Sequence, residues 1–391
     1  MKVWRNLLIG AVVFACLWTG LNYYLSSEIK KHYNKNIYND YGVISKDQGV
    51  ILQQTALDKG DLLLFGSSEL ASTVDQKTTR FFPTKEFPYS VCSIGRAGVL
   101  SMEDSLNIES LHFTPDSKVV FLVSLGWFTD YSIVPDAFYA NFSKNKFYRY
   151  MSDWSIPDQE KIDTAARVSD LIGTYTDTED LDAWAIGKIS RKIPIAFKAA
   201  NVLTYPWMMF VQAVLNTKDL AASLDYLDKQ SAQEQKPLAA TDWNKEYLNA
   251  DVQGGKAVSD SDFYFEDSYR SQIEEILPGQ KNSSAGVDLT NSLELRDYDT
   301  FLKTCKRKHI KPLIIVESVN GWYFDYKGLG KDKRIAMYSK LCSMANEYGF
   351  EAYDMSALEY TPYAYSDEWH LGWRGWLYVN QKITGYFGQN R

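Results

Sequence analysis

The sequence predicts an α/β protein with a mainly parallel five-stranded sheet, preceded by one apolar helix near the N-terminus. Three observations support this: a long uncharged run near the start, short apolar runs separated by helix-like sequence, and a serine just after the first of those runs. Such alternation is typical of βαβ units. With 391 residues, 45% of them hydrophobic, the chain is long enough to bury a large core.

Residues 7–25 contain no charged residue and are expected to form a transmembrane anchor after a short cytoplasmic segment, 1–6. At ~1.5 Å per residue, a helix of this length just spans a bilayer core. Trp18, Tyr23 and Tyr24 lie toward its far end, where interface aromatics are common. A cleaved signal peptide is the alternative, but no clear small-residue cleavage site follows. Basic residues flank both ends, so charge does not decide the orientation.

Residues 26–58 are polar and rich in tyrosine, and we expect a partly helical stalk there. The rest, 59–391, is expected to form one catalytic domain. Its strand candidates are short apolar runs at 62–65, 89–94, 119–123, 313–316 and 352–354. Right-handed crossovers would bring the ends of these strands to one edge of the sheet.

A helical insertion at about 150–290 is expected to cap the edge of the sheet, because this stretch has no strong strand signal. Within it, 193–215 is unusually apolar but is interrupted by Lys198 and Pro206. Those interruptions favour a pair of helices packed over the sheet. A single helix lying on the membrane is the alternative.

The composition argues against several classes of function. A net charge of −7 makes nucleic acid an unexpected partner. Asp367, Glu368 and His370 have no second histidine or cysteine beside them, so no metal is expected. Gly95-Arg96-Ala97-Gly98 follows a strand candidate but lacks the third glycine and the acidic partner of a dinucleotide-binding fingerprint. We therefore expect no cofactor.

Ser68 and His370 are the strongest candidates for chemistry. Ser68 follows an apolar strand and Gly66, at the sheet edge where open α/β folds bind ligands. Asp367 precedes His370 by three residues, so it can bond one ring nitrogen while the other faces a serine. Ser67 could instead begin the next helix as its cap, and either serine could be only a cap. The sequence thus predicts a Ser/His/Asp arrangement for acyl transfer.

These residues resemble the first and last blocks of the SGNH (GDSL-type) hydrolases, which have a three-layer, flavodoxin-like fold. Nearly the whole chain is also similar to the DltD family of teichoic acid D-alanyl transfer proteins. Three segments carry that closer resemblance: Phe65-Gly66-Ser67-Ser68-Glu69-Leu70, Val319-Asn320-Gly321-Trp322-Tyr323 with Asp325-Tyr326-x-Gly328-Leu329, and His370-Leu371-Gly372-Trp373-Arg374-Gly375-Trp376.

The resemblance implies Ser68 as nucleophile, His370 as base and Asp367 as the residue that orients it. The backbone N–H groups of Ser68, Gly95 and Gly126 are expected to form the oxyanion hole. Four further residues are expected to contact substrate: Asn320, Trp127, Trp369 and Arg374. Arg374 is chosen for its charge and its place beside the histidine in the sequence.

The third block departs from the family pattern. Residues 124–128 read Ser-Leu-Gly-Trp-Phe, where the family usually has Ser-Pro-Gln-Trp-Phe. Gly126 therefore lacks a polar side chain, and losing one oxyanion donor typically costs about 10²–10³ in rate. The backbone N–H of Gly126 or the side chain of Asn320 could replace it, and the sequence leaves both open.

The resemblance implies D-alanyl transfer to lipoteichoic acid at the outer face of a Gram-positive cell membrane, through a D-alanyl ester on Ser68. It also implies a single-pass anchor, an extracellular catalytic domain and a partner, the membrane-bound O-acyltransferase DltB. The alternatives are an esterase or thioesterase that transfers to water, a non-catalytic docking subunit that binds the acceptor, and a carbohydrate O-acetyl esterase or transferase.

Overall fold

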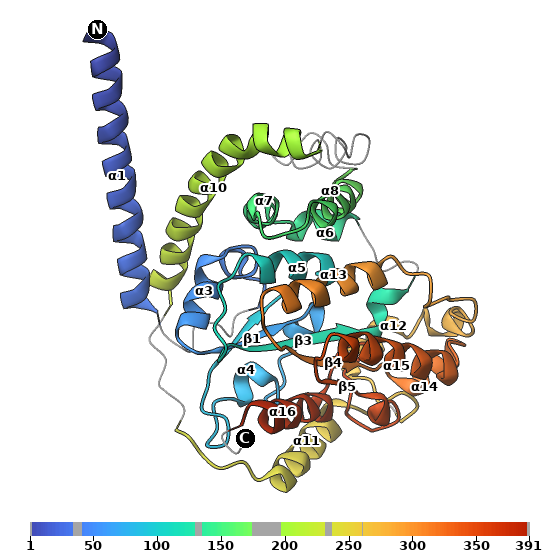
Figure 1. Ribbon diagram of the computed structural model, residues 1–391. Helices are drawn as coiled ribbons and strands as arrows, with labels where there is room; N and C mark the ends of the chain where they lie inside the picture. The colour runs from blue at the N-terminus through green and yellow to red at the C-terminus, as the bar shows by residue number, and fades with distance from the viewer. Residues whose placement is uncertain are drawn as a thin grey trace.

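The computed structural model describes residues 2–33, 41–129, 135–173, 197–230, 237–259 and 261–388, and an all-parallel sheet lies at its centre (Figure 1). The strands are β1 (Leu62–Phe65), β2 (Val91–Ile94), β3 (Lys118–Ser124), β4 (Leu313–Glu317) and β5 (Ala352–Asp354), in the spatial order β2-β1-β3-β4-β5. The predicted fold class is confirmed, with five parallel strands at the predicted places. Only β2 is clearly shorter than predicted, because its pairing with β1 begins at Val91.

Helices cover both faces of the sheet, because strand side chains alternate between them. Leu63 and Phe65 pack into the core on one face, and Leu62 and Leu64 into the core on the other. On the first face lie α5 (Ser101–Glu109), α13 (Glu294–Arg307) and α15 (Lys331–Glu347), and on the second α4 (Thr78–Phe81) and α16 (Trp373–Phe387). Figure 1 shows the three layers nearly edge-on.

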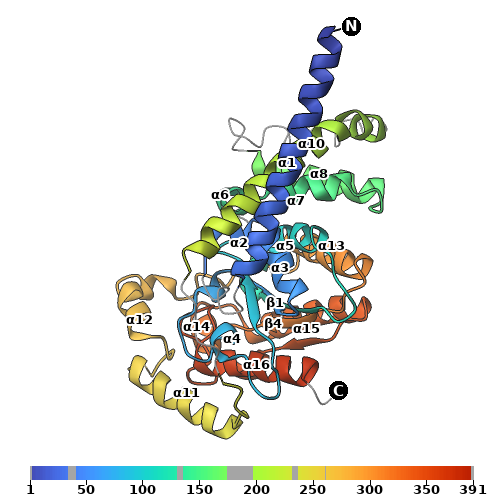
Figure 2. The ribbon, with the colours of Figure 1, turned by 90° about the vertical axis from the view of Figure 1, so that its left-hand side faces the viewer.

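A further group of helices lies beyond the first face and has its own core. Its members are α6 (Pro135–Asn141), α7 (Lys144–Ser152), α8 (Asp158–Ile172) and α10 (Phe197–Asp228). Met102 and Leu106 of α5 join this core, so it packs on the helices above the sheet (Figures 1 and 2). This part of the predicted insertion therefore does not cap the sheet edge.

The predicted pair of helices within 193–215 is wrong for the described part of that range. Helix α10 continues through Pro206, and Figure 1 shows it as one curved helix. A proline inside a helix removes one backbone hydrogen bond and commonly bends the helix without ending it. Several apolar side chains on its first half are exposed, including Leu203, Trp207 and Phe210. Residues 193–196 lie outside the described residues.

The N-terminal helix α1 (Lys2–His32) is longer than the predicted anchor. Among the described residues it is the one helix long and apolar enough to cross a membrane. Its last turns are buried against the second half of α10: Leu25 and Ile29 join Leu220 and Leu227 in the main core. The structure thus gives the chain one candidate single-pass span, attached to the body through α10.

The segment predicted as a stalk is only partly exposed. It contains α2 (Ile44–Asp47) and α3 (Ile51–Asp58), and α3 packs against the sheet with Leu52 and Ala56 fully buried. Its polar composition is misleading, because some of its polar side chains are buried in the fold: Gln53, for example, is fully buried and donates to the carbonyl of Lys46 at 2.8 Å. Residues 44–58 therefore belong to the folded body.

Candidate active site

Ser68 lies just beyond the end of β1, where the chain turns away from the sheet. The strand ends at Phe65, and a short 3-10 turn begins at Ser68 and ends at Ala71. The helix expected to begin at these serines is only this short turn. Ser67 is almost fully buried and its hydroxyl donates to the carbonyl of Arg96 at 3.2 Å. Of the two candidate serines, Ser68 is therefore the one that faces the histidine.

Ser68, His370 and Asp367 form one chain of hydrogen bonds. The Oγ of Ser68 lies 2.8 Å from Nε2 of His370, and Nδ1 of His370 lies 2.6 Å from Oδ2 of Asp367. A carboxylate can only accept, so Nδ1 carries a proton and Nε2 of the neutral ring accepts from the serine. The structure thus brings Asp367 and His370 together with Ser68, which lies 302 positions before His370 in the sequence. This is the geometry of a serine nucleophile with its base.

The loop that carries His370 is held rigidly by its own backbone. The second carboxylate oxygen of Asp367 accepts the N–H groups of Trp369 at 2.8 Å and His370 at 2.7 Å. An antiparallel bridge between Tyr365 and Leu371 closes the loop just before α16. Both oxygens of Asp367 are therefore used, and they fix the position and the tautomer of the imidazole.

The pKa of His370 is raised above its ordinary value of 6.5 by its acidic neighbours. Burial on its own lowers this pKa, because it disfavours the charged ring. The hydrogen bond and charge of Asp367, with the charges of Glu69 and Glu368, outweigh burial. His370 therefore binds a proton readily, as a base that accepts the serine proton must.

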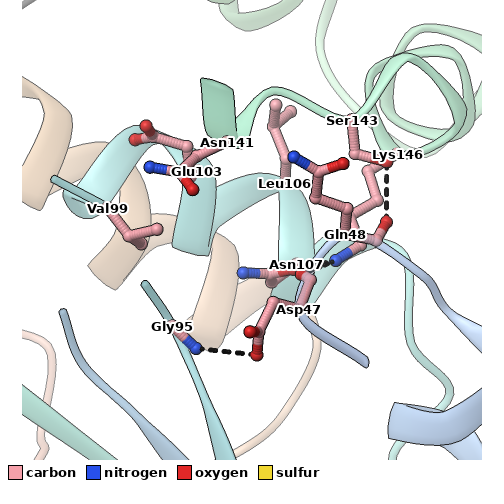
Figure 3. A pocket seen from close by; sticks show the side chains of 10 residues that line it. All are labelled: Asp47, Gln48, Gly95, Val99, Glu103, Leu106, Asn107, Asn141, Ser143 and Lys146. Carbon is pink, nitrogen blue, oxygen red and sulfur yellow. Dashed lines mark hydrogen bonds between the residues drawn. The ribbon is translucent and has the colours of Figure 1, made fainter. Parts of the chain in front are cut away.

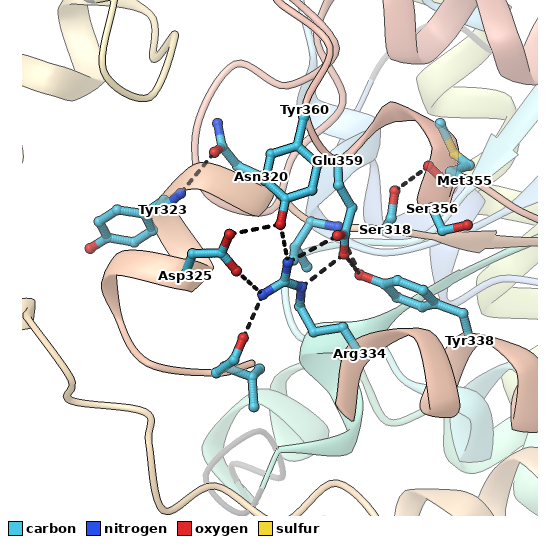
Figure 4. Close-up of polar contacts among 12 residues, drawn as sticks. Ser318, Asn320, Tyr323, Asp325, Arg334, Tyr338, Met355, Ser356, Glu359 and Tyr360 are labelled. Carbon is cyan, nitrogen blue, oxygen red and sulfur yellow. Dashed lines mark hydrogen bonds and ion pairs between the residues drawn. The ribbon is translucent and has the colours of Figure 1, made fainter. Parts of the chain in front are cut away.

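A buried ion pair holds the segment that leads to this loop (Figure 4). Arg334 of α15 and Glu359 are both fully buried, and their Nε and Oε1 atoms lie 2.8 Å apart, with a second bond of 2.9 Å. The same guanidinium donates to Asp325 at 2.9 Å and to the Tyr360 hydroxyl at 3.0 Å. The chain leading from β5 to His370 is thus fastened to α15 and to Asp325 in the helix Gly321–Tyr326 that follows β4.

The candidate triad opens onto a pocket of about 780 Å³. Its wall includes Ser68, Asp367 and His370, together with residues of the turn after β1, of α11 (Trp243–Ala257) and of the loop before α12 (Asp267–Ile273). Three charged members, Asp75, Lys256 and Glu266, were not predicted from the sequence. Lys256 and Glu266 come from the predicted insertion at about 150–290, and no local motif marks either residue.

The backbone N–H of Gly95, predicted as an oxyanion donor, has a partner within the protein. This N–H donates to Oδ1 of Asp47 at 3.2 Å, and both residues line a small cavity (Figure 3). The N–H is therefore not available to an oxyanion. Gly95 is required for another reason: with φ +147, a Cβ there would lie 1.8 Å from the carbonyl oxygen of Gly66. The turns after β1 and β2 can approach this closely only with glycine at that position.

Gly126 lies against Trp369, the neighbour of His370. A Cβ on Gly126 would come within 3.0 Å of the indole ring. The ring of Trp369 also packs edge-on against Phe324, with centroids 4.6 Å apart. A glutamine at position 126 would need this ring to move, which gives a steric reason for the departure from the family pattern. The Gly126 N–H has only a long contact, 3.4 Å, to the hydroxyl of Ser124.

Three of the four residues predicted to bind substrate make structural contacts within the protein. Asn320 is buried, caps α14 (Gly321–Tyr326) by accepting the Tyr323 N–H, and donates to the carbonyl of Phe263. Trp127 is buried in the core beside Phe121. Arg374 pairs with Asp251 of α11 at 2.5 and 2.6 Å and does not line the pocket. Trp369 is partly buried and packs beside Gly126, next to the site.

Comparisons with known proteins agree with this architecture. The profile of the family described as DltD protein matches residues 42–388. The chain belongs to the DltD family. It is similar to Protein DltD of Bacillus subtilis (strain 168), with 25% identity over 344 residues that cover 87% of this chain and 86% of the relative.

Two other members are similar to the chain. Protein DltD of Lacticaseibacillus rhamnosus is 23% identical over 87% of this chain and 80% of its own length. Protein DltD of Staphylococcus aureus (strain NCTC 8325 / PS 47) is 25% identical over 68% of this chain and 65% of its own length. The matches to this family confirm the resemblance that the three sequence segments predicted.

Proposed function

We propose that this protein is a serine acyltransferase that passes D-alanyl groups to lipoteichoic acid through an ester on Ser68. Membership of the DltD family supports a role in the D-alanylation of teichoic acids. The observation that carries the enzymatic part is the chain of hydrogen bonds from Ser68 Oγ through His370 to Asp367. The pocket at its open end has the volume of a small-ligand site.

In the first half of the reaction, Ser68 Oγ attacks the carbonyl carbon of a D-alanyl ester or thioester while Nε2 of His370 takes its proton. The carbonyl oxygen becomes an oxyanion, and the backbone N–H of Ser68, which has no partner among the described residues, would donate to it. The bond to the leaving group then breaks, and His370 returns its proton to the leaving oxygen or sulfur. The product is D-alanyl-Ser68.

The second half reverses these roles. A hydroxyl of the polyglycerol-phosphate chain attacks the D-alanyl-Ser68 carbonyl, and His370 accepts the hydroxyl proton. When the bond to Ser68 breaks, His370 returns the proton to Oγ. One ester bond forms for each that breaks, so the enzyme is regenerated without a cofactor. Asp367 keeps its charge throughout and stabilises the imidazolium that forms in each half.

The proposal places the folded body outside the cell, with α1 as its single-pass anchor and the site facing the membrane-bound O-acyltransferase DltB as donor. It also gives the site one backbone oxyanion donor fewer than expected, because Asp47 holds the N–H of Gly95. That loss favours the second candidate, a docking subunit that binds acceptor and partner without an acyl-serine step.

The two candidates are separated by transfer to acceptor. The full-length protein in detergent is incubated with a D-alanyl ester donor and lipoteichoic acid, and ester-linked D-alanine on the polymer is measured. We expect transfer with the natural protein and with Ser67→Ala, whose hydroxyl faces Arg96 and not His370. Ser68→Ala should abolish it. Equal transfer with and without Ser68 would favour the docking role, and loss of D-alanine to water alone would favour an esterase.

A further inference from the structure

Among the described residues, the pocket wall holds one acidic side chain, Glu266, whose carboxylate has no hydrogen bond or ion pair. Glu266 lies at the start of α12 and is half-buried in the same pocket as Ser68 and His370. We propose that Glu266 selects aminoacyl over neutral acyl groups, by pairing with the ammonium group of the D-alanyl ester bound at Ser68. This inference rests on the proposed D-alanyl transfer and assigns its acyl specificity to one residue.

The backbone of Glu266 is fastened to the loop of the triad. Its N–H donates to the carbonyl of Ser366 at 2.8 Å, and Ser366 immediately precedes Asp367. Its own carbonyl accepts the N–H of Arg270 within α12. The position of Glu266 is therefore set by the segment that sets the position of His370, so the carboxylate and the reacting centre keep a constant relation.

The carboxylate of Glu266 has no hydrogen bond or ion pair in the part of the chain that the structure describes. The other acidic residues of the wall are engaged: Asp367 holds His370, and Asp75 accepts from Gln253 at 2.9 Å. The wall also contains a cation, Lys256, but it forms no ion pair with Glu266. A half-buried carboxylate in a binding pocket without a partner is a position where a ligand cation would be stabilised.

The electrostatics of the pocket wall also favour a bound cation beside Glu266. Burial raises the pKa of Glu266, and the negative charges of Asp367 and Asp267 raise it further. A positive charge placed in the pocket would lower this pKa and so offset these effects. A phosphate group of the polymer would have the opposite effect beside Glu266, and the exposed Lys256 on α11 is the better site for it.

A D-alanyl ester supplies the missing cation. An α-amino group has a pKa near 8, so it is largely protonated at neutral pH. In an alanyl ester this ammonium is attached to the carbon next to the carbonyl, so it enters the same pocket when the carbonyl faces Ser68. Acetyl and lactyl esters have no charge at this position and leave Glu266 without a partner.

The test compares two esters that differ only at the acyl amine. Full-length protein is mixed with a D-alanyl ester or with the D-lactyl ester of the same alcohol, in which a hydroxyl replaces the ammonium. The rate of acylation of Ser68 is followed by intact-protein mass spectrometry. For Glu266→Gln we expect the D-alanyl rate to fall about 10–100-fold and the D-lactyl rate to change less than about threefold, as expected for loss of one charged hydrogen bond.

The ratio of the two rates is read within each variant, so it does not depend on the fraction of folded protein. Glu368→Gln is the matched control: Glu368 pairs with Lys327 at 3.3 Å, does not line the pocket, and should leave the ratio unchanged. An unchanged ratio in Glu266→Gln would overturn this inference and leave the acyl-serine step standing. Absence of any Ser68 adduct from either ester in the natural protein would overturn the proposed function, and this inference with it.

Discussion

Replacing Asp367 with asparagine should disable His370 as a base without disturbing the fold. The carboxylate lies 2.6 Å from Nδ1 of His370, and an amide at the same place can present its NH₂ group to that nitrogen. Nδ1 would then accept and Nε2 would carry the proton, so the ring could no longer accept from Ser68. A positioned base contributes about 10²–10⁴-fold, and we expect the rate of Ser68 acylation to fall by that factor.

The same substitution should also change how the acylation rate depends on pH, because Asp367 raises the pKa of His370. The base acts in its neutral form, so acylation rises with pH through the pKa of His370, which is raised above 6.5 in the natural protein. Removing the hydrogen bond and charge of Asp367 removes the largest of the effects that raise this pKa. The acid limb of the residual activity should therefore shift to lower pH.

Single-turnover acylation by one D-alanyl ester, measured from pH 5 to 9, provides the assay. All variants share the ester, so titration of its own amine cancels in the comparison. Glu368→Gln removes a charge that also raises the pKa of His370 but makes no bond to the ring. Glu368→Gln should shift the acid limb of the acylation rate slightly to lower pH and leave the plateau rate unchanged. A natural plateau rate in Asp367→Asn, or an unmoved acid limb, would refute this account of the base.

Two further predictions concern the support of the site. Arg334→Met should lower the free energy of unfolding by about 3–5 kcal/mol in urea titrations, because it leaves Glu359 buried and unpaired; a cost below 1 kcal/mol would contradict this. Gly126→Ala should lower stability by about 1–3 kcal/mol and slow acylation, because its Cβ would press on Trp369. Gly385→Ala is its control: a Cβ there has open space, and stability should rise by about 0.5–1 kcal/mol.

The triad could be predicted because each of its parts has a local signal. Ser68 follows a strand that the apolar run at 62–65 reveals, and Asp367 and His370 are three residues apart. Parallel strands place such turns at one edge of the sheet, so two distant segments meet without any further information. The structure brings these three side chains together as predicted.

The pocket wall and the oxyanion donors could not be predicted in the same way. Glu266 reaches the site only because the loop before α12 bonds to Ser366, a contact between positions 100 residues apart for which the sequence carries no signal. The N–H of Gly95 is taken by Asp47, from a segment whose polar composition suggested a stalk. Charge and sequence proximity pointed to Arg374, but tertiary packing pairs it with Asp251. Each difference arises from a long-range polar contact.

The acyl-enzyme itself tests the central claim most directly. Full-length protein is incubated with a D-alanyl ester, quenched in acid, and its intact mass and peptides are compared with those of Ser68→Ala. The account predicts one D-alanyl adduct, mapped to Ser68 and absent from the variant. A folded protein that binds the ester but acquires no adduct, or one acylated equally without Ser68, would contradict it.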